Sequence, residues 1–356
     1  VDGTVEVTGV ELKSGVSLAL SNGENTNFST NLVVLQEGAT LNVAGMRNAD
    51  GTSNASLVQA VLNDGSTLIT SDALHTMSAS TSYNVSGTGT LQLEVAENAA
   101  PVITVTDPSF AGSVLVTGGT VDGLQSSIAG GTWKFTNEGG MAFSEIGVLD
   151  STIVFAGNAT MDVATGATVT YSSVPTHEGE GGFTKKGEGT LKLTNANIDL
   201  HHINVADGLL QISDAGGQAR RQISLDAATL SGGVMEVVAG RQAENATGYN
   251  TPTMSIGSLT VAGDSTLKIN YDAQYWSLSN LKFEGEGKTL TLNSTSNTGY
   301  FSRFVFDGTA VGTTEGTVKL TLSPTTSGCR AVAIQIASND ALKNAGVDLN
   351  SIENGN

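Results

Sequence analysis

The chain has 356 residues, 44 of them glycine, and a net charge of −18, from 16 Lys and Arg against 34 Asp and Glu. This balance argues against a nucleic-acid partner and against adhesion to anionic lipid, because both require clustered basic side chains. Cys329 is the only cysteine, so no internal disulfide can form, and no apolar run is long enough to span a membrane as a helix.

A short phrase recurs along the chain, in which turn residues are followed by a short segment that alternates between apolar and polar residues. The alternation predicts a β-strand with one buried face, and glycine at the corner permits a sharp turn. In chain order the phrase reads "EGATLNV" from Glu37, "DGSTLIT" from Asp64, "GTGTLQL" from Gly87, "GGTWKF" from Gly130, "DSTIVF" from Asp150, "GATVTY" from Gly166, "GEGTLKL" from Gly187, "DGLLQI" from Asp207, "GGVMEV" from Gly232, "GDSTLKI" from Gly263, "GEGKTLTL" from Gly285 and "EGTVKLTL" from Glu315.

The spacing of the phrases distinguishes two all-β folds. The residue before each later strand is 166, 189, 208, 233, 264, 287 or 316, so the intervals are uneven, shortest between 189 and 208 and longest between 233 and 264. A pair of β-sandwiches would have a hairpin turn roughly every 8 to 12 residues. The longer intervals favour an all-β, right-handed parallel β-helix (β-solenoid) of roughly 12 to 15 coils, in which each coil covers the apolar edge of the one before it.

We expect this β-helix to occupy residues 1–330, with the clearest repeat at 187–212. Helix signals are short, at Asn54–Leu62 ("NASLVQAVL") and Ser338–Gly346 ("SNDALKNAG"). Residues 331–356 should therefore form a C-terminal strand plus a short helix or cap. Because the chain opens in the middle of a pattern, we expect it to be a piece of a longer protein, with missing flanking domains.

Two phrases in the middle of the chain resemble a known repeat. "GEGTLKLTNAN" (187–197) and "INVADGLLQ" (203–211) are similar to the two halves of the passenger-associated transport repeat of bacterial autotransporters. The resemblance is good over this short stretch alone, and within it Asp199, His201 and His202 depart from the family pattern. It implies a parallel β-helix at, or released from, the surface of a Gram-negative cell, whose outer-membrane domain is missing from this chain.

The adjacent His201 and His202 are the first candidates for chemistry. On a strand they would point to opposite faces and could not both hold one metal, while Asp199 could orient His201. His75 and His177 are isolated, and no pattern of metal ligands or cofactor-binding motif occurs. We therefore expect no metal, no cofactor and a structural role at a corner for the histidine pair.

Other candidates also have simpler explanations. "HEGEGG" (177–182) could contribute carboxylates to a cation but is expected to be a solvated loop, and Arg220 and Arg221 a surface turn. Cys329 has no nearby histidine in the sequence and is expected to be a semi-buried thiol. Since parallel β-helices also host polysaccharide-degrading enzymes, a glycoside hydrolase or lyase remains an alternative, although no pair of acidic residues stands out.

Aromatic residues gather near one end of the chain, where eight of the 18 fall between Tyr271 and Phe306. They suit either an interior stack near the end of a solenoid or a surface that recognises sugars and proteins. For the second alternative we select a candidate recognition surface formed by Tyr271, Tyr275, Trp276, Tyr300 and Phe301. Phe304 and Phe306 alternate with Val305 and are expected to face one way.

We accordingly expect a non-enzymatic β-solenoid, secreted or held at the bacterial surface, that acts as an adhesin or a structural stalk. Its partners would be host or bacterial glycans or proteins. A polysaccharide-degrading enzyme and a self-associating filament or biofilm component are the alternatives, the latter because an uncovered end coil is a template for further strands.

Overall fold

The computed structural model describes residues 3–21, 26–46, 55–71, 80–97, 99–195, 198, 200–213, 223–238, 254–269, 275–294, 302–306, 316–322, 332–336 and 354–355. In these residues the protein is all-β, and its parallel strands stack as a β-solenoid, which confirms the predicted fold class. The described strands make about 10 turns, fewer than the 12 to 15 coils predicted. The described residues contain no helix, and so none that is long and apolar enough to cross a membrane. The chain divides into two compact units, Val1–Phe143 with Ser151–Met161 and Ser144–Asp150 with Asp162–Asn356.

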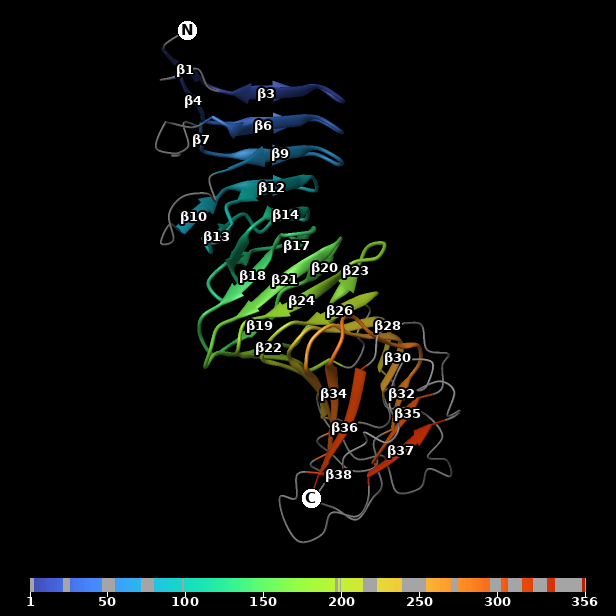
Figure 1. Ribbon diagram of the computed structural model, residues 1–356. Coiled ribbons are helices and arrows are strands. Elements are labelled where there is room, and N and C mark those ends of the chain that lie inside the picture. Colours follow the sequence, from blue (N-terminus) through green and yellow to red (C-terminus); the bar gives the residue numbers. More distant parts are fainter. Residues whose placement is uncertain are drawn as a thin grey trace, which may run out of the picture. The chain divides into compact units, whose positions relative to one another are not determined.

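The first unit consists of parallel columns in which each coil adds one strand. The longest has the order β3-β6-β9-β12-β14-β17-β20, and the shorter ones are β1-β4-β7, β2-β5-β8-β11, β10-β13-β16 and β15-β18. Figure 1 shows β3, β6, β9 and β12 lying one beside the next. The strands are β1 (Gly3–Val7), β2 (Val10–Leu12), β3 (Ser17–Ser21), β4 (Thr26–Thr30), β5 (Val33–Leu35), β6 (Thr40–Gly45), β7 (Ala55–Leu57), β8 (Ala60–Leu62), β9 (Thr67–Thr70), β10 (Ser80–Tyr83), β11 (Val85–Gly87), β12 (Thr90–Val95), β13 (Val102–Val105), β14 (Ser113–Gly118), β15 (Thr120–Asp122), β16 (Ser127–Ile128), β17 (Thr132–Phe135), β18 (Gly140–Phe143) and β20 (Ile153–Phe155).

The second unit has two long columns of parallel strands. One has the order β24-β26-β28-β30-β32-β35-β37, with β33 also paired to β30, and the other β19-β22-β25-β27-β29-β31-β34-β36-β38. The strands are β19 (Gly147–Leu149), β22 (Thr168–Tyr171), β23 (Thr176–His177), β24 (Gly182–Lys186), β25 (Thr190–Leu193), β26 (His202–Val205), β27 (Leu209–Ser213), β28 (Ile223–Leu230), β29 (Val234–Val238), β30 (Met254–Val261), β31 (Ser265–Ile269), β32 (Tyr275–Leu278), β33 (Leu281–Phe283), β34 (Lys288–Ser294), β35 (Ser302–Phe306), β36 (Gly316–Leu322), β37 (Val332–Ile336) and β38 (Asn354–Gly355), while β21 (Asn158–Val163) crosses the boundary between the units.

The spacing of the phrases identified seven consecutive strands of one nine-stranded column. The seven strands that follow residues 166, 189, 208, 233, 264, 287 and 316 are β22, β25, β27, β29, β31, β34 and β36, which are consecutive neighbours in one sheet. The uneven intervals between these positions therefore reflect coils of different length around strands that keep their stacking order.

The interior is built from in-register apolar side chains. Leu41, Leu68, Leu91, Val114 and Trp133 occupy equivalent positions on successive strands, and each is at most 1% exposed. The stacking of one coil on the next removes these side chains from water, which is the main contribution to the stability of such a fold. Leu18 occupies the same position on β3, the first strand of this column, and is in register with Leu41. No strand of the column covers it on its other side, and it is 38% exposed.

The corners before β3, β6 and β9 share one turn. The N–H of Val16, Ala39 and Ser66 donates to the carbonyl oxygen three residues earlier, at 3.1, 2.9 and 3.0 Å. The third residue of each turn is a glycine, with φ between 65° and 72°, a left-handed conformation that disfavours any side chain. The sequence "LxxG" therefore ends one strand and directs the chain into the next.

The helix predicted at Asn54–Leu62 is wrong. Residues 55–57 and 60–62 form the strands β7 and β8, which pair in parallel with β4 and β5. The spacing of their apolar residues is compatible with a helix or with two short strands. Pairing with the preceding coil stabilises the strands, because tertiary contacts override a weak helix propensity. The helix predicted at Ser338–Gly346 lies outside the described residues. Within the predicted C-terminal segment, residues 332–336 form a strand.

Candidate recognition surface

Trp276 belongs to the interior and corrects the predicted aromatic surface. Its side chain is fully buried, and β32 places it in register with Met254 and Phe304 on neighbouring strands. Phe283 is also buried, at 1% exposed, so the described aromatic side chains of this region follow the interior alternative. Tyr271, Tyr300 and Phe301 lie outside the described residues, and so does the side chain of Tyr275, whose backbone is part of β32.

The two histidines contact polar groups of the following coil. His201 Nδ1 lies 3.1 Å from Asp226 Oδ2, and His202 Nε2 lies 3.0 Å from Thr229 Oγ1. Both partners come from β28, which pairs with β26 so that His202 is opposite Ala227. Sequence reasoning missed Asp226, because this partner belongs to the next coil and only the register brings it close. Asp199, the predicted partner, lies outside the described residues.

This arrangement does not form a nucleophile triad. The carboxylate contacts one imidazole and the hydroxyl contacts the other, whereas a triad needs a single imidazole to carry both contacts. Burial, and to a lesser extent the neighbouring His201, lower the pKa of His202. Among the described residues no group of three or more His, Cys, Asp or Glu side chains could hold a metal ion.

Lys185 is a charged residue of the interior that the sequence did not single out. It is fully buried and lies in register with Val205 of β26, which is also buried. Its Nζ donates to the carbonyl oxygens of Lys186, Gly187 and Asp207, at 2.8, 2.5 and 3.1 Å. Burial lowers the pKa of Lys185 to about 8, although nearby carboxylates oppose the shift.

A second buried charge lies in the other long column of the second unit. Glu236 is 1% exposed, its Oε2 accepts a hydrogen bond from Gln211 Nε2 at 2.6 Å, and its Oε1 lies 2.8 Å from Lys268 Nζ. The three residues occupy one register position on β27, β29 and β31. Each carboxylate oxygen therefore has a partner on a neighbouring coil, which is how a buried charge is tolerated.

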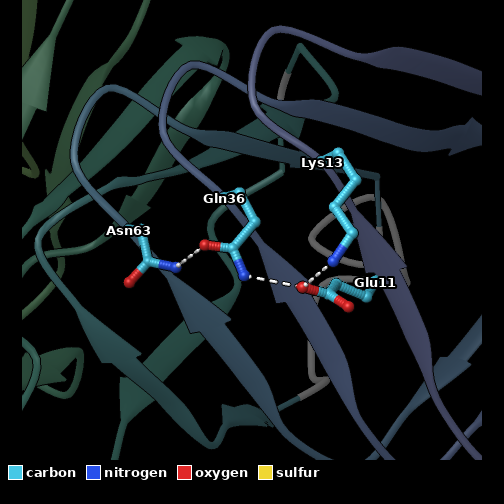
Figure 2. Close-up of polar contacts among 4 residues, drawn as sticks. All are labelled: Glu11, Lys13, Gln36 and Asn63. Carbon is cyan, nitrogen blue, oxygen red and sulfur yellow. Dashed lines mark hydrogen bonds and ion pairs between the residues drawn. The ribbon is translucent and has the colours of Figure 1, made fainter.

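Polar side chains also form ladders between the corners of the first unit. Asn63 Nδ2 donates to Gln36 Oε1 at 3.2 Å, and Gln36 Nε2 donates to Glu11 Oε1 at 2.7 Å, as Figure 2 shows. Lys13 Nζ lies 2.8 Å from the same Glu11 oxygen. The hydrogen bonds from Lys13 and Gln36 lower the pKa of Glu11. The two contacts of Gln36 follow the stacking direction, whereas Lys13 and Glu11 belong to one coil, and all four side chains are exposed or partly exposed.

The outward face of the longest column of the first unit presents a row of hydroxyl groups. We call this row the hydroxyl ladder, and it contains Ser17, Thr40, Thr67, Thr90, Ser113 and Thr132, one residue from each of six consecutive strands. Five of these residues are partly exposed and Ser17 is exposed. Successive members are one strand spacing apart, about 4.8 Å. The ladder is therefore a regular, solvent-accessible array of donors and acceptors.

Of the remaining sequence candidates, the structure describes only the segment 177–182. In the segment 177–182, His177 Nδ1 contacts the carbonyl of Gly179 and the N–H of Gly181 donates to Glu178, which makes this a local loop. His75, Arg220, Arg221 and Cys329 lie outside the described residues. No protein-family model matches the chain, and neither a curated protein nor a solved structure is detectably similar to it.

Proposed function

We propose that the protein is a non-enzymatic adhesin of the bacterial cell exterior, in which a β-solenoid presents the hydroxyl ladder to a polymeric ligand. The single observation that carries the proposal is the ladder itself, because six hydroxyl residues in register offer the same group at every coil. A repeating array is suited to a repeating ligand. The glycans of a host or neighbouring cell are such ligands, and they are rich in groups that exchange hydrogen bonds with hydroxyls.

The location and the family belong to the same proposal. The autotransporter-like phrases at 187–197 and 203–211, together with the solenoid fold, support a passenger domain carried to the exterior by a domain outside this chain. A single cysteine suits a protein that is exported before it folds. The acidic net charge of −18 favours neutral or cationic glycans and protein surfaces over other polyanions.

A glycan array tests this proposal. Replacing Thr40, Thr67 and Thr90 together by valine keeps the shape and strand propensity of the face but removes three hydroxyls, so binding should fall at least several-fold. The matched control replaces Thr168, Thr190 and Thr266 by valine, since these are partly exposed threonines at one outward register position of β22, β25 and β31. The control should bind like the unchanged chain.

The same samples separate the alternatives. An adhesin leaves the glycan intact, whereas a polysaccharide-degrading enzyme releases reducing ends or unsaturated products during incubation. A filament-forming protein shows light scattering that grows with concentration whether or not a glycan is added. Equal loss of binding in both triple variants, or release of sugar, would contradict the adhesin proposal.

A further inference from the structure

The first coil of the solenoid is uncovered on one side. Its three strands β1, β2 and β3 are each the terminal strand of a column, so among the described strands each has a neighbour on one side only. Figure 1 shows β1 and β3 at the N-terminal end of the first unit. Of the six large apolar side chains that are exposed in the described residues, Val7, Val16 and Leu18 belong to this coil. The open end therefore presents unpaired backbone together with apolar side chains.

The strand β3 lacks the side chains that usually protect such an edge. Soluble proteins keep edge strands from pairing with other chains by placing charges or proline on them. The stretch "SGVSLALS" (14–21), which ends with β3, has neither a charged residue nor a proline, although the chain has a net charge of −18. The charges of this coil belong to the other strands, where Glu11 of β2 pairs with Lys13 at 2.8 Å. The strand β3 is therefore open to pairing.

The free backbone groups of β3 belong to Ser17, Ala19 and Ser21. The carbonyl oxygen of Val16 accepts a hydrogen bond from the N–H of Thr40 on β6, at 2.9 Å. Successive residues of a strand direct their backbone groups to opposite sides, so those of Ser17, Ala19 and Ser21 point away from β6. The register with β6 shifts between Ala19 and Ser21, but the additional residue belongs to β6, so the alternation along β3 is maintained.

The sequence of β3 is the same in both directions, since it reads "SLALS" with Ala19 at its centre. A two-fold axis at Ala19 would pair two copies of β3 antiparallel, with Ser17 opposite Ser21 of the second copy and Leu18 opposite Leu20. Ala19 would then exchange hydrogen bonds with Ala19 of the second copy, and each serine with the opposing serine. Every residue with free backbone groups is paired in this register.

The same register matches the two faces of the strand. Leu18 is in register with the buried Leu41, and Leu20 is two positions further along the strand on the same face. Opposing residues of an antiparallel pair have their side chains on one face of the sheet, so the leucines of both copies lie on the interior side. The second copy would therefore cover the apolar end of the interior.

We propose that two copies of this chain associate head to head through β3 and form a closed dimer with two-fold symmetry. The symmetry of the strand identifies the partner, because parallel stacking of another coil does not require a sequence that reads the same in both directions. A two-fold contact uses the open end of both copies, so association stops at the dimer, unlike that of a filament. This inference goes beyond the adhesin proposal and does not depend on it, because it is measured as molecular mass and not as glycan binding.

Size-exclusion chromatography with light scattering tests the association on the full 356-residue chain. Over a concentration series, the mass should rise from that of the monomer and level off at that of the dimer. Added salt should favour the dimer, because it screens the repulsion between two chains of net charge −18 and β3 itself has no charge. A mass that stays at the monomer at every concentration, or that grows beyond the dimer, would overturn the proposal.

Charge variants at the opposing serines test the register of the contact. Ser17→Lys/Ser21→Lys and Ser17→Glu/Ser21→Glu each place like charges opposite each other, so each variant should be a monomer where the unchanged chain is a dimer. A mixture of the two variants, or the single chain Ser17→Lys/Ser21→Glu, opposes unlike charges and should restore the dimer. Dimers in both like-charged variants, or no dimer in the mixture, would contradict the two-fold register.

Two controls separate a lost contact from a lost fold. Ser17 and Ser21 are exposed, so all of these variants should keep the circular-dichroism spectrum of the unchanged chain. Val58→Lys adds a charge at a residue that is 60% exposed in a bend of a later coil, and it should still form the dimer. Equal loss of the dimer in Val58→Lys and in the like-charged variants would show that β3 is not the contact.

Discussion

Lys185 is accommodated in the interior because its ammonium group is surrounded by acceptors. Three carbonyl oxygens accept its hydrogen bonds, two at the end of β24 and one at the corner after β26, so the charge has polar partners although the side chain is fully buried. The strand pattern alone places residue 185 on the inward face with Phe183, two positions earlier. What the pattern does not predict is that carbonyls from two corners, one of them at Asp207, converge on that position.

Replacing Lys185 by methionine should destabilise the fold by roughly 2 kcal/mol near pH 7, because three carbonyls lose their donor. The effect should grow with pH. Since the pKa of Lys185 is lowered to about 8 in the folded protein, the unfolded chain binds more protons between about pH 8 and pH 10. Stability of the unchanged chain relative to Lys185→Met should therefore rise by roughly 1 to 2 kcal/mol from pH 7 to about pH 9.5.

Urea unfolding at the two pH values measures this difference directly. Lys186→Met serves as the control, because the side chain of Lys186 is exposed on the same strand. If the gap between the unchanged chain and Lys185→Met shrinks or stays constant as the pH rises, the lysine is not held with a depressed pKa.

At the scale of the strands, the sequence predicted where strands begin after a corner. It did not predict which side chains of neighbouring coils contact each other. Alternation after a glycine or aspartate located β22, β25, β27, β29, β31, β34 and β36 in their stacking order. The same reasoning could not predict that Asp226 contacts His201 or that Glu236 contacts Lys268. The coil lengths between these residues vary, and the register that brings them together is set by the stacked interior.

The ladder formed by Gln211, Glu236 and Lys268 should stabilise the stacking of β27, β29 and β31. Lys268→Met would leave a carboxylate at 1% exposure without its cation, and we expect a loss of roughly 2 kcal/mol, less than for a fully buried pair because Lys268 is partly exposed. The double variant Glu236→Gln/Lys268→Met removes the unpaired charge and should recover part of this loss. A double variant less stable than Lys268→Met, measured by thermal unfolding, would contradict this account.

At the scale of the whole molecule, stacking places equivalent side chains of successive coils in regular rows, although the sequence repeats only weakly. Parallel in-register stacking aligns one outward residue per coil, so a few Ser and Thr residues become the hydroxyl ladder and a few charged residues become interior or surface ladders. The adhesin proposal depends on that register. The central claim is therefore that neighbouring strands stack in parallel and in register. Disulfide formation between engineered cysteines tests this claim.

In a Cys329→Ser background, the pairs Thr67→Cys/Thr90→Cys and Thr90→Cys/Ser113→Cys place thiols on neighbouring strands, in register and about 4.8 Å apart between Cα atoms, within the range that a disulfide spans. The pair Thr67→Cys/Ser113→Cys skips one strand and lies about twice as far apart, beyond that range. Under mild oxidation, mass spectrometry of the monomer should find disulfides in the two neighbouring pairs and free thiols in the third. A disulfide in the third pair, or free thiols in all three, would contradict the stacked parallel register.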